Sequence, residues 1–259
     1  MNIKILPRDW NAASFFVENP GNYSILRVDL NIDGFMRDRM HPSGCFSIAV
    51  NPQAEDFPDR LTDFIAYENS HGRCVLIHSP NFDIEHSLNY RQHPSNYVRK
   101  TDPPFAVHST LLNSYEQIIK TGCLKSTTRL NKEGAGRTAI GIEQLGEPKD
   151  YLDYIMFGVP DGKGSGSEAL VNSYLLGKVC FDPNAPYTPQ ARMYFDVRKM
   201  IKDGLVVRDG IHLAKVFDIL PLNDYLLKTV FEKDVTLPEG EAFWTPDLFK
   251  KCANDFFYD

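Results

Sequence analysis

The chain has 259 residues, which is enough for two domains of ordinary size, and 42% of them are hydrophobic, a composition that argues against general disorder. The net charge is −6, and lysine and arginine form no run of five or more, which argues against a non-specific nucleic-acid binder. Net charge does not describe a single cleft, so a local basic groove stays open.

The cysteines and the N-terminus bear on the cellular compartment. Five cysteines with no CxxC pair predict free thiols in a reducing compartment rather than a disulfide scaffold. No apolar run suits a signal peptide or a membrane span. We therefore expect a cytoplasmic protein without a membrane partner, acting in a host cytoplasm if it is an effector. The histidines lack zinc-like spacing, so no metal is expected.

The first hundred residues predict a mixed α/β region, because short apolar runs alternate with turn-forming clusters. The polar, proline-containing segment 86–104 predicts a linker, with a domain boundary near residue 102. We accordingly expect an accessory domain of unknown role over 1–104 and a second domain over 105–259. The elements expected in the first domain are strands at 24–30, 45–50 and 74–78 and a helix at 59–69.

The second domain opens with a strand at 105–107, which is followed by His108-Ser109-Thr110. Apolar positions at helical spacing predict a helix over 111–121, and Gly122 stands where a C′ glycine is expected. The later elements expected are a strand at 192–197, a helix at 198–202, strands at 205–208 and 211–216 about an Asp209-Gly210 hairpin turn, and an amphipathic stretch at 223–231.

The tripeptide His108-Ser109-Thr110 offers groups suited to a dinucleotide, although the chain has no GxGxxG and no GxxxxGK[ST]. An imidazole at a strand end can hydrogen-bond a ribose hydroxyl, and the next residues can bind an amide such as nicotinamide. Without a ligand, Ser109 and Thr110 would instead be the N-cap of the following helix.

The order of these features resembles the ADP-ribosyltransferase superfamily, nearest to its RNA 2′-phosphotransferase branch and to related ADP-ribosylating toxins. In that branch a strand ends in His-Gly-Thr, followed by a helix, a Gly-Leu and an Arg. Here the matching residues are His108-Ser109-Thr110, Gly122-Cys123-Leu124 and Arg129. Segments 194–204 and 209–226 resemble its later strands and its ending. The resemblance covers roughly residues 105–231.

The resemblance implies an α+β protein in which the N-terminal mixed α/β region precedes an ADP-ribosyltransferase-like split β-sandwich with flanking helices. It also implies that NAD is a substrate. His108 would anchor a ribose, and Arg129 would hold the pyrophosphate, because a guanidinium matches two phosphate oxygens. The residues expected to bind NAD are His108, Ser109, Thr110 and Arg129, with Tyr151 and Tyr154 as candidates for stacking on nicotinamide.

An acidic residue is also expected at the site. Loss of nicotinamide passes through an oxocarbenium-like state, which a carboxylate near the ribose stabilises. Many transferases of this superfamily place a Glu on the closing strand, and Asp209 is nearest to that position here, although Asp-Gly is also a turn signal. Glu168 and Glu143 are the other candidates, so the catalytic set is His108 with Asp209 or a glutamate.

Three functions follow as hypotheses. The first is an NAD-dependent ADP-ribosyltransferase that modifies a protein or nucleic-acid acceptor, as toxins, effectors and defence proteins do. The second is an RNA 2′-phosphotransferase, which requires a basic groove in the N-terminal half and which residues 137–142 match poorly. The third is a degenerate transferase fold that binds a nucleotide or a partner without catalysis, suggested by Ser109 at the family's glycine position.

Overall fold

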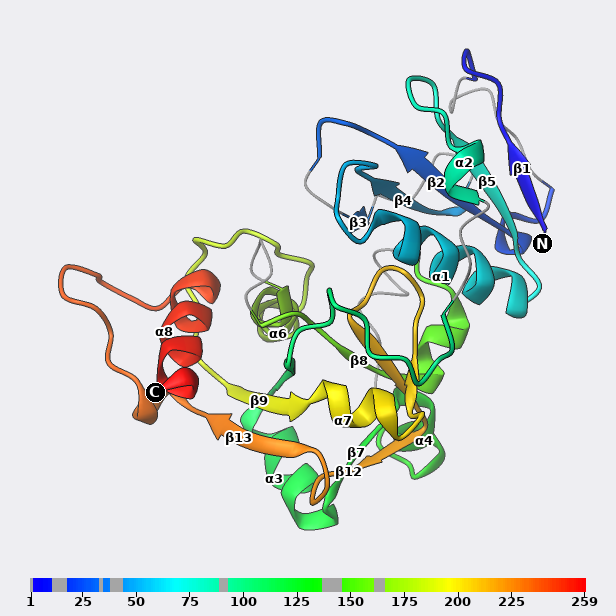
Figure 1. Cartoon of the computed structure of the whole chain (residues 1–259). Helices are drawn as coiled ribbons and strands as arrows, with labels where there is room; N and C mark the ends of the chain where they lie inside the picture. The colour runs from blue at the N-terminus through cyan, green and yellow to red at the C-terminus, as the bar shows by residue number, and fades with distance from the viewer. Residues whose placement is uncertain are drawn as a thin grey trace. The chain divides into compact units, whose positions relative to one another are not determined.

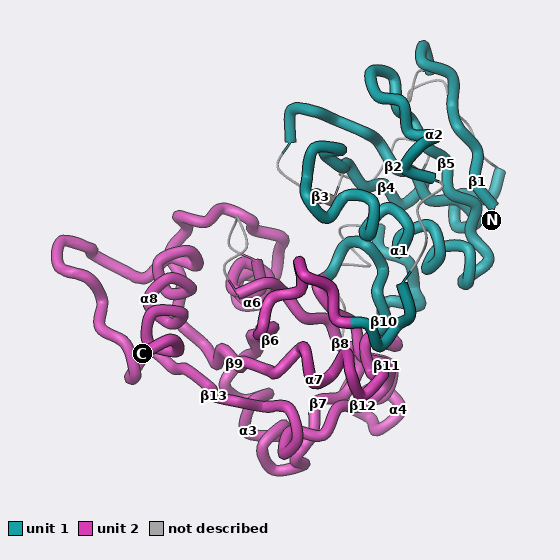
Figure 2. Tube along the Cα trace, in the orientation of Figure 1, with its two compact units in different colours: residues 1–97, 141–151, 207–212 teal, residues 98–140, 152–206, 213–259 magenta. Residues whose placement is uncertain are grey.

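The computed structural model describes residues 2–10, 18–32, 35–37, 44–88, 93–136, 146–160 and 166–259 (Figure 1). The fold is mixed α/β, as predicted, and no helix in these ranges is long and apolar enough to cross a bilayer. The chain divides into two compact units (Figure 2). Unit 1 comprises 1–97, 141–151 and 207–212, and unit 2 comprises 98–140, 152–206 and 213–259.

The division differs in detail from the expected domains of 1–104 and 105–259. The first crossing between units falls between residues 97 and 98, close to the expected boundary. Two short segments of the second half, 141–151 and 207–212, belong to unit 1. The N-terminal unit is therefore built from three separate pieces of chain.

Unit 1 is built on a five-stranded sheet in the order β1-β5-β2-β4-β3, in which β3 alone is antiparallel to its neighbour. Helix α1 packs against this sheet, and its Glu68 accepts a hydrogen bond from the Ser24 hydroxyl of β2 (Figure 1). The elements are β1 (Ile3–Ile5), β2 (Tyr23–Val28), β3 (Phe35–Arg37), β4 (Phe46–Val50), α1 (Phe57–Ser70), β5 (Cys74–His78) and α2 (Glu85–Leu88), with a 3-10 turn at Pro20–Asn22.

Side-chain contacts explain why the segment 141–151 joins unit 1. Arg73 forms ion pairs with Glu68 and, at 2.6 Å, with Asp150. Burial raises the pKa of Asp150, but its hydrogen bonds from Arg73 and Tyr67 outweigh burial, so the pKa lies below its usual value. Tyr151 follows, and its ring packs edge-on against other aromatic rings of the unit 1 core.

Unit 2 holds most of the remaining elements. They are β6 (Phe105–Thr110), α3 (Leu112–Thr121), β7 (Cys123–Lys125), α4 (Thr127–Lys132), β8 (Tyr154–Phe157), α6 (Gly166–Leu176), β9 (Ala191–Asp196), α7 (Val197–Lys202), β11 (Ala214–Phe217), β12 (Ile219–Pro221), β13 (Leu226–Val230) and α8 (Pro246–Tyr258), with a 3-10 turn at Glu232–Asp234. A further 3-10 turn, Lys149–Asp153, begins in unit 1 and ends in unit 2. Strand β10 (Val206–Val207) lies where the chain passes to unit 1.

In the described part of unit 2, the strands form three small sheets. Their strand orders are β13-β9-β6, β10-β11-β8 and β12-β7. The first two sheets meet where the backbones of Val107 and Gly158 exchange hydrogen bonds of 3.0 and 2.9 Å. Side chains alternate across β6, so Ala106 packs in one core with strands of both sheets, whereas Val107 packs with α6 and α8 on the opposite face.

Some of the elements predicted for residues 105–259 agree with the structure and others differ from it. Gly122 ends α3 in the left-handed conformation with φ +68°, which confirms the predicted C′ glycine. The amphipathic stretch 223–231 forms strand β13, which pairs antiparallel with β9. The strands about Asp209-Gly210 are shorter than expected, so a longer connection replaces the tight hairpin turn. Residues 137–142 lie outside the described residues.

Candidate active site on strand β6

His108 lies on β6, and the fold determines how its imidazole is protonated. Its Nδ1 is 3.1 Å from the carbonyl oxygen of Met156 on β8. A carbonyl only accepts, so Nδ1 carries the proton and Nε2 presents a lone pair. Desolvation lowers the pKa of His108 below its usual value, and the contact with Met156 offsets this only in part. The imidazole of the half-buried His108 is therefore neutral near neutral pH, and its Nε2 can accept a hydrogen bond from a hydroxyl.

Ser109 points to the opposite face of β6 from His108. Its hydroxyl donates to Oε1 of Glu168 on α6 at 2.5 Å. The same Oε1 accepts a hydrogen bond of 2.6 Å from Nη1 of Arg192. Arg192 lies on β9, directly opposite Ser109 in the strand register. Glu168 is 0% and Arg192 1% exposed, so the ion pair is fully enclosed. Two predicted site residues, Ser109 and Glu168, are thus brought into direct contact.

A hydrogen-bond network surrounds the buried guanidinium of Arg192. It donates to the Tyr194 hydroxyl, to Asn254 Oδ1 on α8 and to the Pro160 carbonyl at 2.8, 2.9 and 3.1 Å. Asn254 in turn donates to Pro160 and accepts from Tyr194. Burial lowers the pKa of Arg192, but the charges of Glu168 and Tyr194 and the hydrogen bonds to them together outweigh burial, so the pKa lies above its usual value. These hydrogen bonds connect β9 with α8 next to Ser109 of β6.

The second oxygen of Glu168 is a further feature of this cluster. Glu168 Oε2 is buried and has no hydrogen-bond partner among the described residues. Burial and the charge of Glu168 both raise the pKa of Tyr187, so its hydroxyl keeps its proton.

Thr110 completes the tripeptide as the last residue of β6. The expected N-cap role of Ser109 and Thr110 does not occur, because the N-cap of α3 is Leu111 and has no side-chain cap. Gln190 instead accepts the backbone N–H of Leu112 at 3.0 Å. Neither hydroxyl therefore caps the helix, and the Ser109 hydroxyl binds Glu168 instead.

Arg129 lies on α4 and is half exposed. Its backbone N–H donates to Ser126, the N-cap of that helix. Its guanidinium contacts Glu133 at 3.1 Å and Asp218 at 3.5 Å. Two carboxylates thus already neutralise this charge, and a pyrophosphate would have to compete with them.

The two tyrosines occupy different environments. Tyr154 is partly exposed on β8, with its ring 5.6 Å from Phe217 and 5.4 Å from Lys215 Nζ. Tyr151 belongs to unit 1 and is only 1% exposed, with its ring packed against Phe46. The expectation that Tyr151 stacks on nicotinamide is wrong, because its enclosed ring has no face left for a ligand.

Asp209, the acidic candidate nearest to the family's closing-strand position, serves a structural role. Asp209 is 0% exposed and belongs to unit 1. Its Oδ1 accepts the backbone N–H groups of Ile211 and His212, and its Oδ2 lies 2.8 Å from His212 Nδ1. The expectation that Asp209 is catalytic is wrong, because both of its carboxylate oxygens are occupied by hydrogen bonds within the turn. Glu143 lies outside the described residues.

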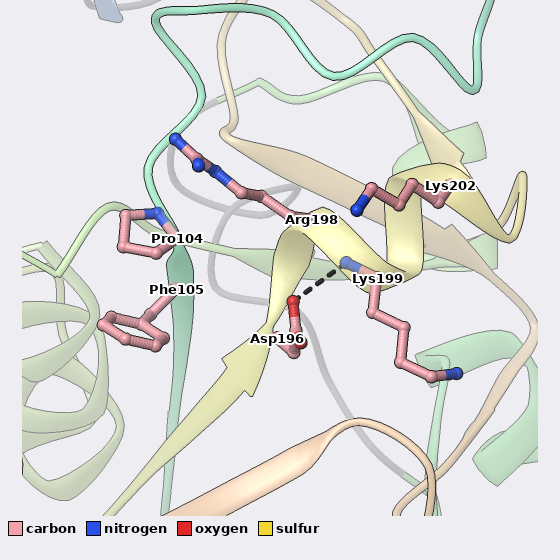
Figure 3. A pocket seen from close by; sticks show the side chains of 6 residues that line it. All are labelled: Pro104, Phe105, Asp196, Arg198, Lys199 and Lys202. Atoms are coloured by element: carbon pink, nitrogen blue, oxygen red, sulfur yellow. Dashed lines mark hydrogen bonds between the residues drawn. The ribbon is translucent and has the colours of Figure 1, made fainter.

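A cationic cavity lies at the first residue of β6. It has a volume of about 450 Å³ and is lined by Pro104, Phe105, Asp196, Arg198, Lys199 and Lys202 (Figure 3). Lys199 donates its backbone N–H to Asp196, and its Nζ pairs with Asp203. Arg198 and Lys202 therefore supply the positive charge that faces the cavity.

Sequence reasoning missed Arg192, Tyr194 and Asn254. A charged residue within the apolar run of β9 was a usable signal, because arginine is almost never fully buried without a partner. Asn254 carried no such signal, since only the packing of α8 brings it to the network. Within the described ranges, no three histidine, cysteine or acidic side chains gather as a metal site.

Comparison with known proteins adds no relative. No model of a protein family matches the chain, and no curated protein or solved structure does so either.

Proposed function

We propose that unit 2 binds NAD along β6 and transfers its ADP-ribosyl group to a macromolecular acceptor. The observation that carries this proposal is the state of His108. A neutral imidazole with its proton held on Nδ1 leaves Nε2 as an acceptor, which is what a ribose hydroxyl requires. This is the role that the resemblance to ADP-ribosyltransferases implies for the histidine.

The chemistry assigned to the site is a glycosyl transfer. The bond between the ribose and nicotinamide breaks, and nicotinamide leaves with the electron pair. The acceptor nucleophile then bonds to the ribose carbon and loses its proton, and water takes this role when no acceptor is present. Glu168 is enclosed, so we assign it to positioning Ser109 through their 2.5 Å hydrogen bond. Two sheets that pack into one core are compatible with a split β-sandwich.

Two isosteric variants of His108 test the proposal. His108→Asn keeps a donor where Nδ1 stands but loses the acceptor at Nε2, so we expect about a tenfold weaker Kd for NAD. His108→Gln keeps an acceptor near Nε2 and should retain more affinity. Calorimetry with NAD and the release of nicotinamide without acceptor measure both effects. His86→Asn, at an exposed histidine of α2, should behave like wild type.

The affinity of the wild-type protein for NAD should also depend on pH in one direction. Because the pKa of His108 lies below the usual value of about 6.5, affinity should be constant above that pH and weaken only on further acidification. If wild-type protein neither binds NAD nor releases nicotinamide, the proposal fails. If His108→Asn binds NAD as well as wild type does, His108 is not the anchor.

RNA 2′-phosphotransfer is the second candidate, and the cationic cavity favours it, although this cavity lies in unit 2 and not in the N-terminal half, where a basic groove was expected. Arg198 and Lys202 line this cavity, and their positive charges can contact phosphate (Figure 3). Incubation of wild type with a 2′-phosphorylated RNA and NAD should transfer the 2′-phosphate from the RNA to the ADP-ribosyl group of NAD, with loss of nicotinamide. Lys202→Gln should weaken RNA binding while NAD affinity stays unchanged. Lys178→Gln, at an exposed lysine outside this cavity, is the matched control. If the RNA keeps its phosphate, this candidate is removed.

A further inference from the structure

The cationic cavity at the start of β6 is large enough for a ligand other than NAD. Its volume of about 450 Å³ falls within the roughly 300–1,000 Å³ of small-molecule sites. Phe105 lines it, whereas His108 lies three residues further along β6, about 10 Å away at the rise of an extended strand. None of its six lining residues belongs to the proposed NAD site. The cavity is therefore separate from that site.

Two positive charges extend from one side of α7 at this cavity. Arg198 and Lys202 are four residues apart, which places them on one face of the helix, and Figure 3 shows both side chains on the side opposite to Lys199. Arg198 donates to the backbone carbonyl of Asp102 at 2.7 Å, a contact that provides no counter-charge. Like charges at this helical spacing repel each other, so an anion bound between them would stabilise α7.

The carboxylates near this pair have other partners. Asp196 lines the cavity, but its Oδ1 accepts the backbone N–H of Lys199 at 2.8 Å as the N-cap of α7. Asp203 accepts a hydrogen bond of 2.8 Å from Lys199 Nζ. Among the described residues, no carboxylate forms an ion pair with Arg198 or Lys202. The charges of these two side chains are therefore left for a ligand.

We propose that this cavity binds a small phosphomonoester of the nucleoside monophosphate class. A phosphomonoester carries a charge of about −1.5 to −2 near neutral pH, which matches the two cations, whereas each phosphodiester of a nucleic-acid strand carries only about −1. Arg198 can bind phosphate oxygens with its remaining N–H groups, and Lys202 can bind another. Pro104 and Phe105 form an apolar part of the lining, against which the base or sugar can pack.

Calorimetry with the full-length chain tests this site, and uridine 5′-monophosphate is the probe because NAD contains no uridine. We expect a Kd at or below about 1 mM. Lys202→Gln should weaken the Kd about tenfold through loss of a charge-assisted hydrogen bond, and Lys202→Arg, which keeps the charge, should retain most of the affinity. Lys178→Gln, at an exposed lysine that does not line the cavity, should bind as wild type does.

The charge of the phosphate gives a second readout. The methyl ester of uridine 5′-monophosphate is a diester and should bind about tenfold more weakly. The second ionisation of a phosphomonoester has a pKa of about 6, so affinity for the monoester should rise about tenfold between about pH 5 and pH 7. Affinity for the diester should stay constant over that range. No histidine is among the six lining residues, so the change reports on the ligand.

Four results would overturn the phosphomonoester site. They are the absence of binding by uridine 5′-monophosphate, equal binding of its methyl ester, equal binding by Lys202→Gln, or weakening by His108→Asn, which would place the ligand in the NAD site. Much tighter binding of a 5′-phosphorylated oligouridylate would also overturn it, because the cavity would then be part of a nucleic-acid groove. NAD binding and nicotinamide release are measured separately, so the proposed transfer does not depend on these results.

Discussion

Arg192→Met should lower the free energy of unfolding of unit 2 by about 3–5 kcal/mol. The guanidinium is 1% exposed and pairs with Glu168 at 2.6 Å, so its removal leaves a buried carboxylate without its counter-charge. Breaking one side of a buried ion pair is costly for that reason, more than for the loss of attraction itself. The Tyr194 hydroxyl and Asn254 also lose a donor.

Tryptophan fluorescence can follow this change unit by unit. The chain has two tryptophans, Trp10 in unit 1 and Trp244 in unit 2, so a Trp10→Phe background leaves only the reporter of unit 2. Urea denaturation in that background measures the effect of Arg192→Met. Arg129→Met is the matched control, because Arg129 is 43% exposed and exposed pairs contribute about 0–1 kcal/mol.

The double variant Glu168→Met with Arg192→Met completes a thermodynamic cycle. Removing both charges should cost less than Arg192→Met alone, because no unpaired charge is left in the core. Equal costs for Arg192→Met and Arg129→Met would contradict the role assigned to the buried pair. A double variant less stable than the Arg192→Met single variant would contradict it as well.

Gly210→Ala should destabilise unit 1 by roughly 2–5 kcal/mol. Gly210 has φ +73°, and a Cβ at this position would lie 2.2 Å from the carbonyl oxygen of Arg60 and 2.9 Å from the backbone nitrogen of Phe64. Both atoms belong to the backbone of α1, which cannot move aside as a flexible side chain does. Displacement would also break the hydrogen bonds of 2.8 and 2.5 Å from Arg60 to the carbonyls of Gly210 and Ile211.

Gly72→Ala separates the clash at Gly210 from the cost of its backbone conformation. Gly72 also lies in unit 1 with φ +77°, but a Cβ there would meet nothing within 4 Å. Gly72→Ala should lower the free energy of unfolding by about 1–2 kcal/mol, which is the effect of the left-handed conformation alone. Urea denaturation in a Trp244→Phe background, where Trp10 reports on unit 1, compares the two. Equal effects would show that the 207–212 segment does not sit closely against α1.

Several elements follow from the sequence because their signals are local. The 3.6-residue spacing of apolar positions indicated α1 and α3, and a glycine at a helix end indicated the cap at Gly122. The apolar runs of β2, β4 and β5 likewise indicated strands. The stretch 223–231 shows the limit of such signals, because a short apolar run forms a helix or a strand according to what it packs against.

For the candidate site, the sequence by itself determined that His108, Ser109 and Thr110 directly follow a short strand. The structure extends that strand, β6, through all three residues. Only the tertiary structure decided that the Met156 carbonyl holds the proton of His108 on Nδ1. It also decided that Glu168, 59 residues from Ser109, reaches that hydroxyl and Arg192, whereas Asp209 and Tyr151 are enclosed in unit 1. The periodicity of a sequence indicates which face of its own helix or strand a residue lies on. The partner of a buried charge depends instead on how distant elements pack, because burial without that partner would be too unfavourable.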